Sequence, residues 1–532
     1  MVAVRSEYLV DASSIEEESA LDVGVRTANT ASFVLAGKIV SFVLGATTVI
    51  VIARILGPSI YGIYILAAAV AGLFGSMGSM GIATAFSKFG AEYRTTHEPH
   101  KLNALASNGH AVLLAVGIVL VLITMAASGP IASYSLHNLH DAYLLRIISL
   151  DVLAAMLMGA GYSLLIGIGK ASHAAAVSVT ASVLQAGVGI PLALLGFGAM
   201  APILGLVASQ AGGYFVAMAL LILRDGVSLG MPSLAGIRKL FSFSMPVALS
   251  NVFGSAVGSA SPLLLGVFAT TAVLGNFGIA SNTNAFFDII LGSITISLLP
   301  TFSSTLANSR LRSRIGEFFS YSLYTAFLMV TPFIIFVAAL AKPVSYVAFS
   351  GQYLLAPLYI RLVAIGLLIS IAGSYASTLL VSASEVRKVM KFSGVIALVQ
   401  LVLLFALVPE FKGIGIVTLL FIITPAVGDI LYIGSVMHTL KVHLALGKLS
   451  RVFLANIISI APALPLSILF GGNYIPLLIT SAAAMLLLYT PVLVLLGGIS
   501  GKDAERIRAV SSSAPIVGKI VGALLAYGFL VG

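Results

Sequence analysis

The chain has 532 residues, of which 59% are hydrophobic and only 9% are charged, and its mean hydropathy is +1.11. This composition lies far outside the range of soluble globular proteins, so the lipid bilayer is the expected solvent. The net charge is +10, and the lack of cysteine excludes disulfides and thiolate metal sites. We therefore expect an all-α membrane protein.

Residues 1–27 are polar and lack the cleavage pattern of a signal peptide, so we expect a cytoplasmic tail. The rest contains stretches of roughly 20 apolar residues, the length that crosses a hydrocarbon core, and they predict about 14 transmembrane helices. Their approximate ranges are 28–55, 61–86, 108–128, 143–167, 173–196, 199–223, 240–268, 276–301, 318–340, 357–381, 390–409, 414–437, 451–471 and 474–497. A further hydrophobic helix at 514–531 either spans the membrane or lies on its surface.

The sequence contains an internal repeat. Arg146 and Arg361 stand 215 positions apart, each near the start of an apolar segment. The other pairs at nearly this offset are Leu164-Leu165 with Leu379-Leu380, Gln185 with Gln400, Gly62-Ile63-Tyr64 with Gly275-Asn276-Phe277, and Phe86-Ser87 with Phe302-Ser303. The repeat predicts two pseudo-symmetric six-helix lobes, 28–224 and 238–438, followed by two additional helices in 449–498. Such duplication is typical of transporters whose halves move about a shared site.

Lysine and arginine are distributed unevenly between the two sides of the predicted helices. The odd-numbered connections carry only Arg54, Lys342 and Lys412, whereas the terminal segments and even-numbered loops carry most of the others. Basic residues are retained on the cytoplasmic side, so we expect the N-terminus in the cytoplasm and the chain in the cell (cytoplasmic) membrane. Topology thus explains the positive charge, and no nucleic-acid partner is expected.

Three short stretches, residues 53–64, 241–250 and 298–303, resemble polysaccharide flippases of the multidrug/oligosaccharidyl-lipid/polysaccharide (MOP) exporter superfamily. Residues 53–64, with Gly57-Pro58 and Gly62, are similar to the turn joining the first two helices of that family. Residues 241–250 resemble the start of its seventh helix, and residues 298–303 the end of its eighth. The resemblance covers about residues 28–497. The residue types also favour a turn at this place, because Gly57-Pro58 suits a tight turn and Gly62 lets the next helix begin against it.

The resemblance implies two six-helix lobes in a V around a cavity lined mainly by helices 1, 2, 7 and 8. The implied substrate is an oligosaccharide linked to a polyprenyl or dolichyl phosphate or pyrophosphate. It would pass outward through this cavity by alternating access and would serve cell-surface polysaccharide or glycoprotein synthesis. A phosphate cannot cross the hydrocarbon core without positive charges around it, so the cavity needs fixed cations. It also needs hydroxyl or amide groups that bind the sugars. We expect the chain to act as a monomer. Its other expected partners are membrane lipids and enzymes of polysaccharide synthesis.

Lys38 is the first candidate to bind the phosphate. It lies about seven residues inside the first helix, roughly 10 Å along the axis, and shares a face with Ser41, Gly45 and Thr48. The alternative is that its flexible stem reaches back to the cytoplasmic interface. Related flippases tend to place basic residues in this helix, and proton-coupled drug exporters of the superfamily tend to carry a carboxylate there.

Four further residues are candidates for the substrate cavity. Arg146 and Arg361, on the expected extracytoplasmic side, either receive the phosphate in the outward-facing state or bind carbonyls and headgroups at the interface. On helix 7, Asn251 and Ser255 either bind sugar hydroxyls or hold helices together.

Carboxylates in the apolar segments are the candidates for ion coupling, because each costs about 3 kcal/mol in a hydrocarbon core. Asp288 shares a face of helix 8 with Asn284, a candidate sugar ligand, and is expected to bind a coupling proton or sodium ion. Asp151 either has the same role or pairs with Lys38 or Arg146. Asp429 is expected near the cytoplasmic end of helix 12, in a capping or interfacial role.

No catalytic residue, cofactor or metal ion is predicted. The sequence has no phosphate-cradling Gly-Lys-Ser/Thr loop, so a proton or sodium gradient or the membrane potential would drive transport. The loop histidines lack the acidic or thiol neighbours that would complete a metal site. A MATE-type drug/cation antiporter of the same superfamily is the main alternative. A membrane glycosyltransferase would need acidic metal-binding motifs or a large external loop, so we expect that the chain is not an enzyme.

Overall fold

The computed structural model describes residues 12–79, 81–307, 309–440, 442, 444–501 and 527–528. Within these ranges, the side chains of 12–36, 38, 246–257, 288–290, 292–297, 300, 307, 309 and 311 lie outside the description. The described residues form helices joined by short turns, with no strand among them, and the all-α class is confirmed for this part of the chain. Most of the expected C-terminal helix at 514–531 lies outside it.

The described part of the chain contains ten helical spans that are long and apolar enough to cross a membrane, so this is a multi-pass membrane protein. Two of these spans bend. Ile39–Gly78 bends at Gly57, and Val386–Leu440 bends at Lys412, where φ is 50°. Each bent span covers two of the predicted segments, and the number fourteen stays a prediction.

Internal contacts divide the chain into two compact units. Unit 1 comprises the residues up to Leu56 and Leu66–Leu263, and unit 2 comprises Gly57–Ile65 and the residues from Leu264 onward. The short segment Gly57–Ile65 therefore packs in unit 2, although its chain neighbours on both sides belong to unit 1.

The division between the units falls inside α7 (Leu234–Phe268), whereas the predicted connection between the lobes was 225–237. The loop before α7 is fixed to α3 (Pro99–Ile131) of unit 1. Ser233 N donates a hydrogen bond to Asn108 Oδ1 at 2.7 Å, and Gly230 N donates to Ser107 Oγ at 2.8 Å. These bonds attach the start of α7 to unit 1.

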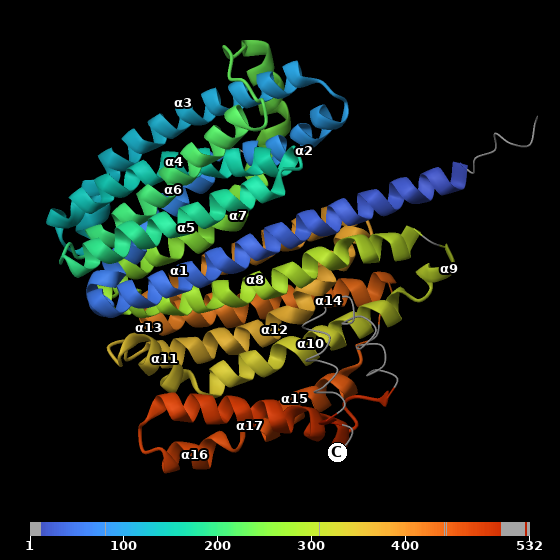
Figure 1. Cartoon of the computed structure of the whole chain (residues 1–532). Helices are drawn as coiled ribbons and strands as arrows, with labels where there is room; N and C mark the ends of the chain where they lie inside the picture. The colour runs from blue at the N-terminus through green and yellow to red at the C-terminus, as the bar shows by residue number, and fades with distance from the viewer. Residues whose placement is uncertain are drawn as a thin grey trace, which may run out of the picture. The chain divides into compact units, whose positions relative to one another are not determined.

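Unit 1 is a bundle built around α4. Its members are α1 (Ala12–Gly78, without 57–65), α2 (Ile82–Thr95), α3, α4 (Ala142–Gly167), α5 (Ala171–Leu194), α6 (Met200–Leu223) and the first part of α7. Figure 1 shows the helices α3 to α6 running alongside one another. α4 packs against α2, α3, α5 and α6, and its span is the most buried of the ten.

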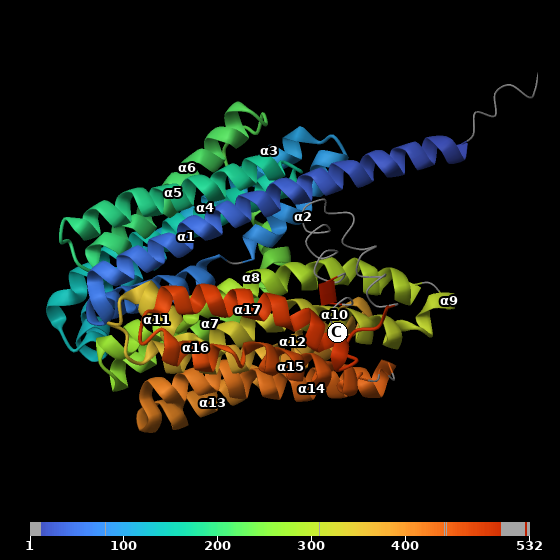
Figure 2. The same ribbon diagram turned by 60° about the horizontal axis from the view of Figure 1, so that its bottom comes forward.

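Unit 2 is built in the same way around α12. Its helices are α8 (Thr271–Ala307), α9 (Ser309–Arg312), α10 (Ile315–Ala339), α11 (Ala341–Phe349), α12 (Ala356–Ser382), α13 (Val386–Thr418), α14 (Thr424–Leu440), α15 (Leu446–Ile460), α16 (Ala463–Leu469) and α17 (Tyr474–Leu495). α12 packs against α8, α10, α13 and α14 and has the second most buried span. Helices α15 to α17 lie beside one another (Figure 2), and buried Asn456 of α15 donates to Thr331 Oγ1 of α10 at 2.9 Å.

Residues that are paired in the repeat occupy matching places in the two cores. Leu164-Leu165 of α4 and Leu379-Leu380 of α12 are completely buried. Phe86 packs on His110 of α3, with ring centroids 5.4 Å apart, and its partner Phe302 packs on Phe319 of α10 at 6.3 Å. The duplicated apolar residues therefore hold the central helix and its neighbours together in each unit.

Candidate functional site

The bend in α1 is a hairpin whose geometry requires its two central residues. Gly57 has φ 70° and ψ 173°, a left-handed φ that residues with a Cβ rarely adopt. Pro58 follows and has the fixed φ that suits the first turn of a helix. The turn predicted at Gly57-Pro58 is therefore present, and it directs the next segment against α8.

The two segments meet at a pair of glycines. A Cβ on Gly62 would overlap the carbonyl oxygen of Thr271, and a Cβ on Gly275 would overlap that of Pro58. Only glycine permits such an approach of two helix backbones. Gly62 and Gly275 are also equivalent positions of the repeat. Two segments of unit 2 thus meet at positions that correspond in the repeat, and we call this contact the glycine crossing.

Polar side chains surround the glycine crossing. Asn282 Nδ2 donates to Tyr61 Oη at 3.1 Å, and the ring of Tyr353 meets Tyr61 edge-on at 6.3 Å. Leu355 N donates to Asn276 Oδ1 at 3.0 Å, which ties α8 to the loop before α12. Burial raises the pKa of Tyr353, so its hydroxyl is neutral at physiological pH. The role of neither asparagine was predicted from the sequence, although Asn276 lies inside a repeated stretch.

Several predicted binding residues cannot be placed through their side chains. Lys38 lies in α1, Asn251 and Ser255 in α7, and Asp288 in α8, but their side chains lie outside the described part of the structure. Asn284 is described, and it is half-buried two residues after Asn282 on α8. The binding and coupling roles of these residues stay predictions.

The two repeated arginines have similar positions in their units. Arg146 is exposed in the second turn of α4, and its Nε donates to Ser128 Oγ of α3 at 3.2 Å. Arg361 is exposed in the second turn of α12. Each arginine therefore presents a positive charge at the end of the central helix of its unit.

Asp151 is buried in unit 1 and is not paired with Arg146. It is only 5% exposed, and its Oδ1 has no hydrogen-bond partner among the described residues. Of the two expected pairings, the one with Arg146 is wrong, because residues five apart lie on different faces of a helix and Arg146 contacts Ser128 instead. The pairing with Lys38 stays a prediction, because the Lys38 side chain lies outside the described part of the structure. A buried carboxylate oxygen without a donor is costly unless the group takes up a proton or cation.

Asp429 is also placed differently from the prediction. It lies about three turns before the end of α14 and packs directly against Gly373 of α12. A Cβ on Gly373 would overlap Asp429 Oδ1. The expected capping or interfacial role is therefore wrong. Asp429 joins two helices of unit 2, an interaction that depends on a glycine distant in sequence.

The glycine crossing predicts unequal effects of two glycine substitutions in unit 2. Gly275→Ala should destabilise the protein by about 1–3 kcal/mol, because the methyl group overlaps backbone that cannot move aside easily. Gly434→Ala in α14 meets nothing within 4 Å and should be neutral or stabilising by up to about 1 kcal/mol. Thermal unfolding in detergent measures both. Equal unfolding temperatures for the two variants would contradict the close approach.

Comparisons with known proteins agree with this architecture. The family model described as "Polysaccharide biosynthesis protein" matches residues 27–306, more than half of the chain. The structure of "Lipid II flippase MurJ, inward closed conformation" is similar with a TM-score of 0.71 and 15% identity, and the alignment covers 87% of this chain and 98% of that one. An inward-facing MATE-family multidrug resistance transporter of the MOP superfamily gives a TM-score of 0.64 at 15% identity, with 75% and 95% covered.

No curated protein matches the sequence significantly. At 15% identity, the two structural similarities establish a shared fold, and the family follows from the sequence model. The chain therefore belongs to the polysaccharide biosynthesis protein family and has the fold of MOP-superfamily transporters.

Proposed function

We propose that the chain is a flippase that moves a lipid-linked oligosaccharide across the cytoplasmic membrane by alternating access. One observation carries the proposal: the polysaccharide-biosynthesis family match occurs in a chain with the fold of a lipid II flippase. The N-terminus lies in the cytoplasm in this proposal, as the distribution of basic residues predicts. Enzymes of polysaccharide synthesis supply the lipid-linked sugar and use it after transport.

The phosphate of the substrate binds to fixed cations during transport. Lys38 is the proposed ligand on the cytoplasmic side, and the exposed Arg146 and Arg361 receive the phosphate on the opposite side. Amide and hydroxyl groups of Asn251, Ser255 and Asn284 are the proposed sugar ligands. The lipid tail remains in the bilayer, so the protein shields only the polar part of the substrate.

The glycine crossing suggests how one side of the transporter closes. While Gly62 and Gly275 are in contact, the segment Gly57–Ile65 is held against α8. Release of the substrate on that side requires this segment to leave α8. The separation breaks the hydrogen bond from Asn282 to Tyr61 and a small backbone contact, so its cost is compatible with a transition of a few kcal/mol between two states.

Asp151 and Asp288 are the proposed coupling carboxylates. The unpaired Oδ1 of Asp151 supports uptake of a proton or sodium ion in unit 1. Asp288 lies on α8 beside the proposed sugar ligand Asn284 and remains an equivalent candidate.

The role of Lys38 can be tested in proteoliposomes with a fluorescent lipid pyrophosphate sugar. Lys38→Ala should slow translocation about tenfold or more, because it removes one charge-assisted interaction of about 1.5–3 kcal/mol. Lys342→Ala, which changes an exposed lysine of α11, should leave the rate unchanged. Equal rates in both variants would refute the assignment of Lys38. Efflux of a cationic drug without lipid movement would instead favour the antiporter.

Coupling is tested in the same vesicles by imposing a proton or sodium gradient. Asp151→Asn should remove the stimulation by the gradient while preserving the shape of the side chain, because an amide cannot take up a proton and has no negative charge to hold a sodium ion. Asp429→Asn serves as the control, because the structure gives its carboxylate a packing role against Gly373. Stimulation that persists in Asp151→Asn and is lost in Asp288→Asn would place coupling at Asp288. Persistence in both would contradict the proposed coupling sites.

A further inference from the structure

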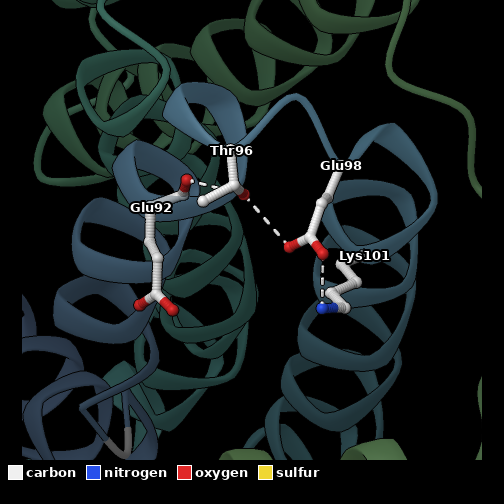
Figure 3. A network of polar contacts seen from close by, with 4 residues as sticks. All are labelled: Glu92, Thr96, Glu98 and Lys101. Atoms are coloured by element: carbon white, nitrogen blue, oxygen red, sulfur yellow. Dashed lines mark hydrogen bonds and ion pairs between the residues drawn. The ribbon is translucent and has the colours of Figure 1, made fainter.

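One end of unit 1 carries a network of polar contacts where α2 ends and α3 begins. Lys101 Nζ donates to Glu98 Oε1 at 2.6 Å (Figure 3). Thr96 Oγ1 lies 3.0 Å from Glu98 Oε2 and 3.1 Å from the carbonyl oxygen of Glu92. The hydrogen bond from Lys101 lowers the pKa of Glu98. The carboxylate is therefore ionised at neutral pH, and Lys101 has a fixed counter-charge.

A pocket of about 200 Å³ adjoins this network. It lies between the end of α2 and the starts of α3 and α7, all of which belong to unit 1. Its lining includes Phe89, Tyr93, Leu105, Leu240, Lys101 and Lys239. This volume is below the roughly 300 Å³ of the smallest common ligand sites, so the pocket suits one part of a larger ligand.

The interior of the pocket is apolar, and neighbouring residues hold its lining side chains in place. Asn108, a polar lining residue, is buried and already accepts a hydrogen bond from Ser233 N at 2.7 Å. Phe89 is held edge-on against Phe243, with ring centroids 4.9 Å apart. A sugar would find few free hydrogen-bonding groups here, whereas a hydrocarbon chain matches the lining.

Positive charge lies directly beside this apolar interior. Lys101 is paired with Glu98, whose charge also acts on Lys239, but Lys239 forms no close ion pair with a carboxylate in the described part of the chain. Lys88 Nζ lies over the rings of Phe89 and Phe243, at 5.1 and 4.5 Å from their centroids. The pocket therefore suits an amphipathic ligand with an anionic head and an apolar tail.

We propose that this pocket binds an anionic membrane phospholipid, with an acyl chain between α2, α3 and α7 and the headgroup phosphate at Lys239 and Lys101. The predicted topology places this end of unit 1 at the cytoplasmic leaflet, where anionic lipids concentrate and attract basic residues. The bound chain supports the contact between α7 and α3. The inference requires only that this end lies at a membrane surface, and it holds whether or not the chain is a flippase.

The absence of tryptophan from the chain permits a direct test. Tyr93→Trp places a single fluorophore in the pocket lining, and brominated lipids quench tryptophan on contact. At equal mole fractions in phosphatidylcholine vesicles, brominated phosphatidylglycerol should bind about fivefold better than brominated phosphatidylcholine, as one lysine near a membrane surface implies. Lys239→Gln should abolish this preference. Ala104→Phe, which fills the pocket without a change of charge, should reduce quenching by both lipids.

The matched control is Lys391→Gln, which removes an exposed lysine of α13 and should leave the preference intact. Native mass spectrometry of the chain without the tryptophan should show retained phosphatidylglycerol that Lys239→Gln loses. Equal quenching by the two lipids, a preference that survives Lys239→Gln, or an equal loss in Lys391→Gln would overturn the proposal. Displacement of phosphatidylglycerol by an equal amount of polyprenyl phosphate would assign the pocket to the transported lipid and would also overturn it.

Discussion

The close approach of Gly62 and Gly275 is the contact on which the proposed mechanism depends. It joins two backbone segments that correspond to each other in the internal repeat, and any side chain larger than hydrogen would force them apart. The hydrogen bond from Asn282 to Tyr61 adds a directional element. A small contact of this kind fixes the position of the two segments, and its separation costs little free energy. A gate between two conformations requires both properties.

The repeat has separate consequences for stability and for chemistry. Its apolar pairs, such as Leu164 with Leu379 and Phe86 with Phe302, occupy the cores and keep each unit intact. The carboxylates of buried Asp151 and half-buried Asp429 are not equivalent in the repeat, and they differ in environment. Asp429 packs against Gly373, whereas Oδ1 of Asp151 is buried and has no hydrogen-bond partner among the described residues. The halves thus share a framework, and the polar groups distinguish them.

The sequence alone predicted the features that depend on local chain properties. Apolar length located the helical segments, and Gly57-Pro58 located the hairpin, because a positive φ and a proline act within a few residues. The pairings of Asn282 with Tyr61 and of Asp429 with Gly373 were not predictable, because each joins segments whose relative positions follow only from packing. The expected pairing of Asp151 with Arg146 failed for a simpler reason. Their five-residue spacing directs the two side chains to different faces of α4.

The most direct test of alternating access is the distance across the glycine crossing during transport. The chain has no cysteine, so Ser59→Cys with Thr270→Cys gives a unique pair of exposed spin-label sites on the two segments. Pulsed electron paramagnetic resonance should record a short distance between the two labels without substrate. A second, longer distance should appear once lipid-linked oligosaccharide and an ion gradient are present. A single unchanged distance in vesicles that are actively translocating the lipid would contradict the account.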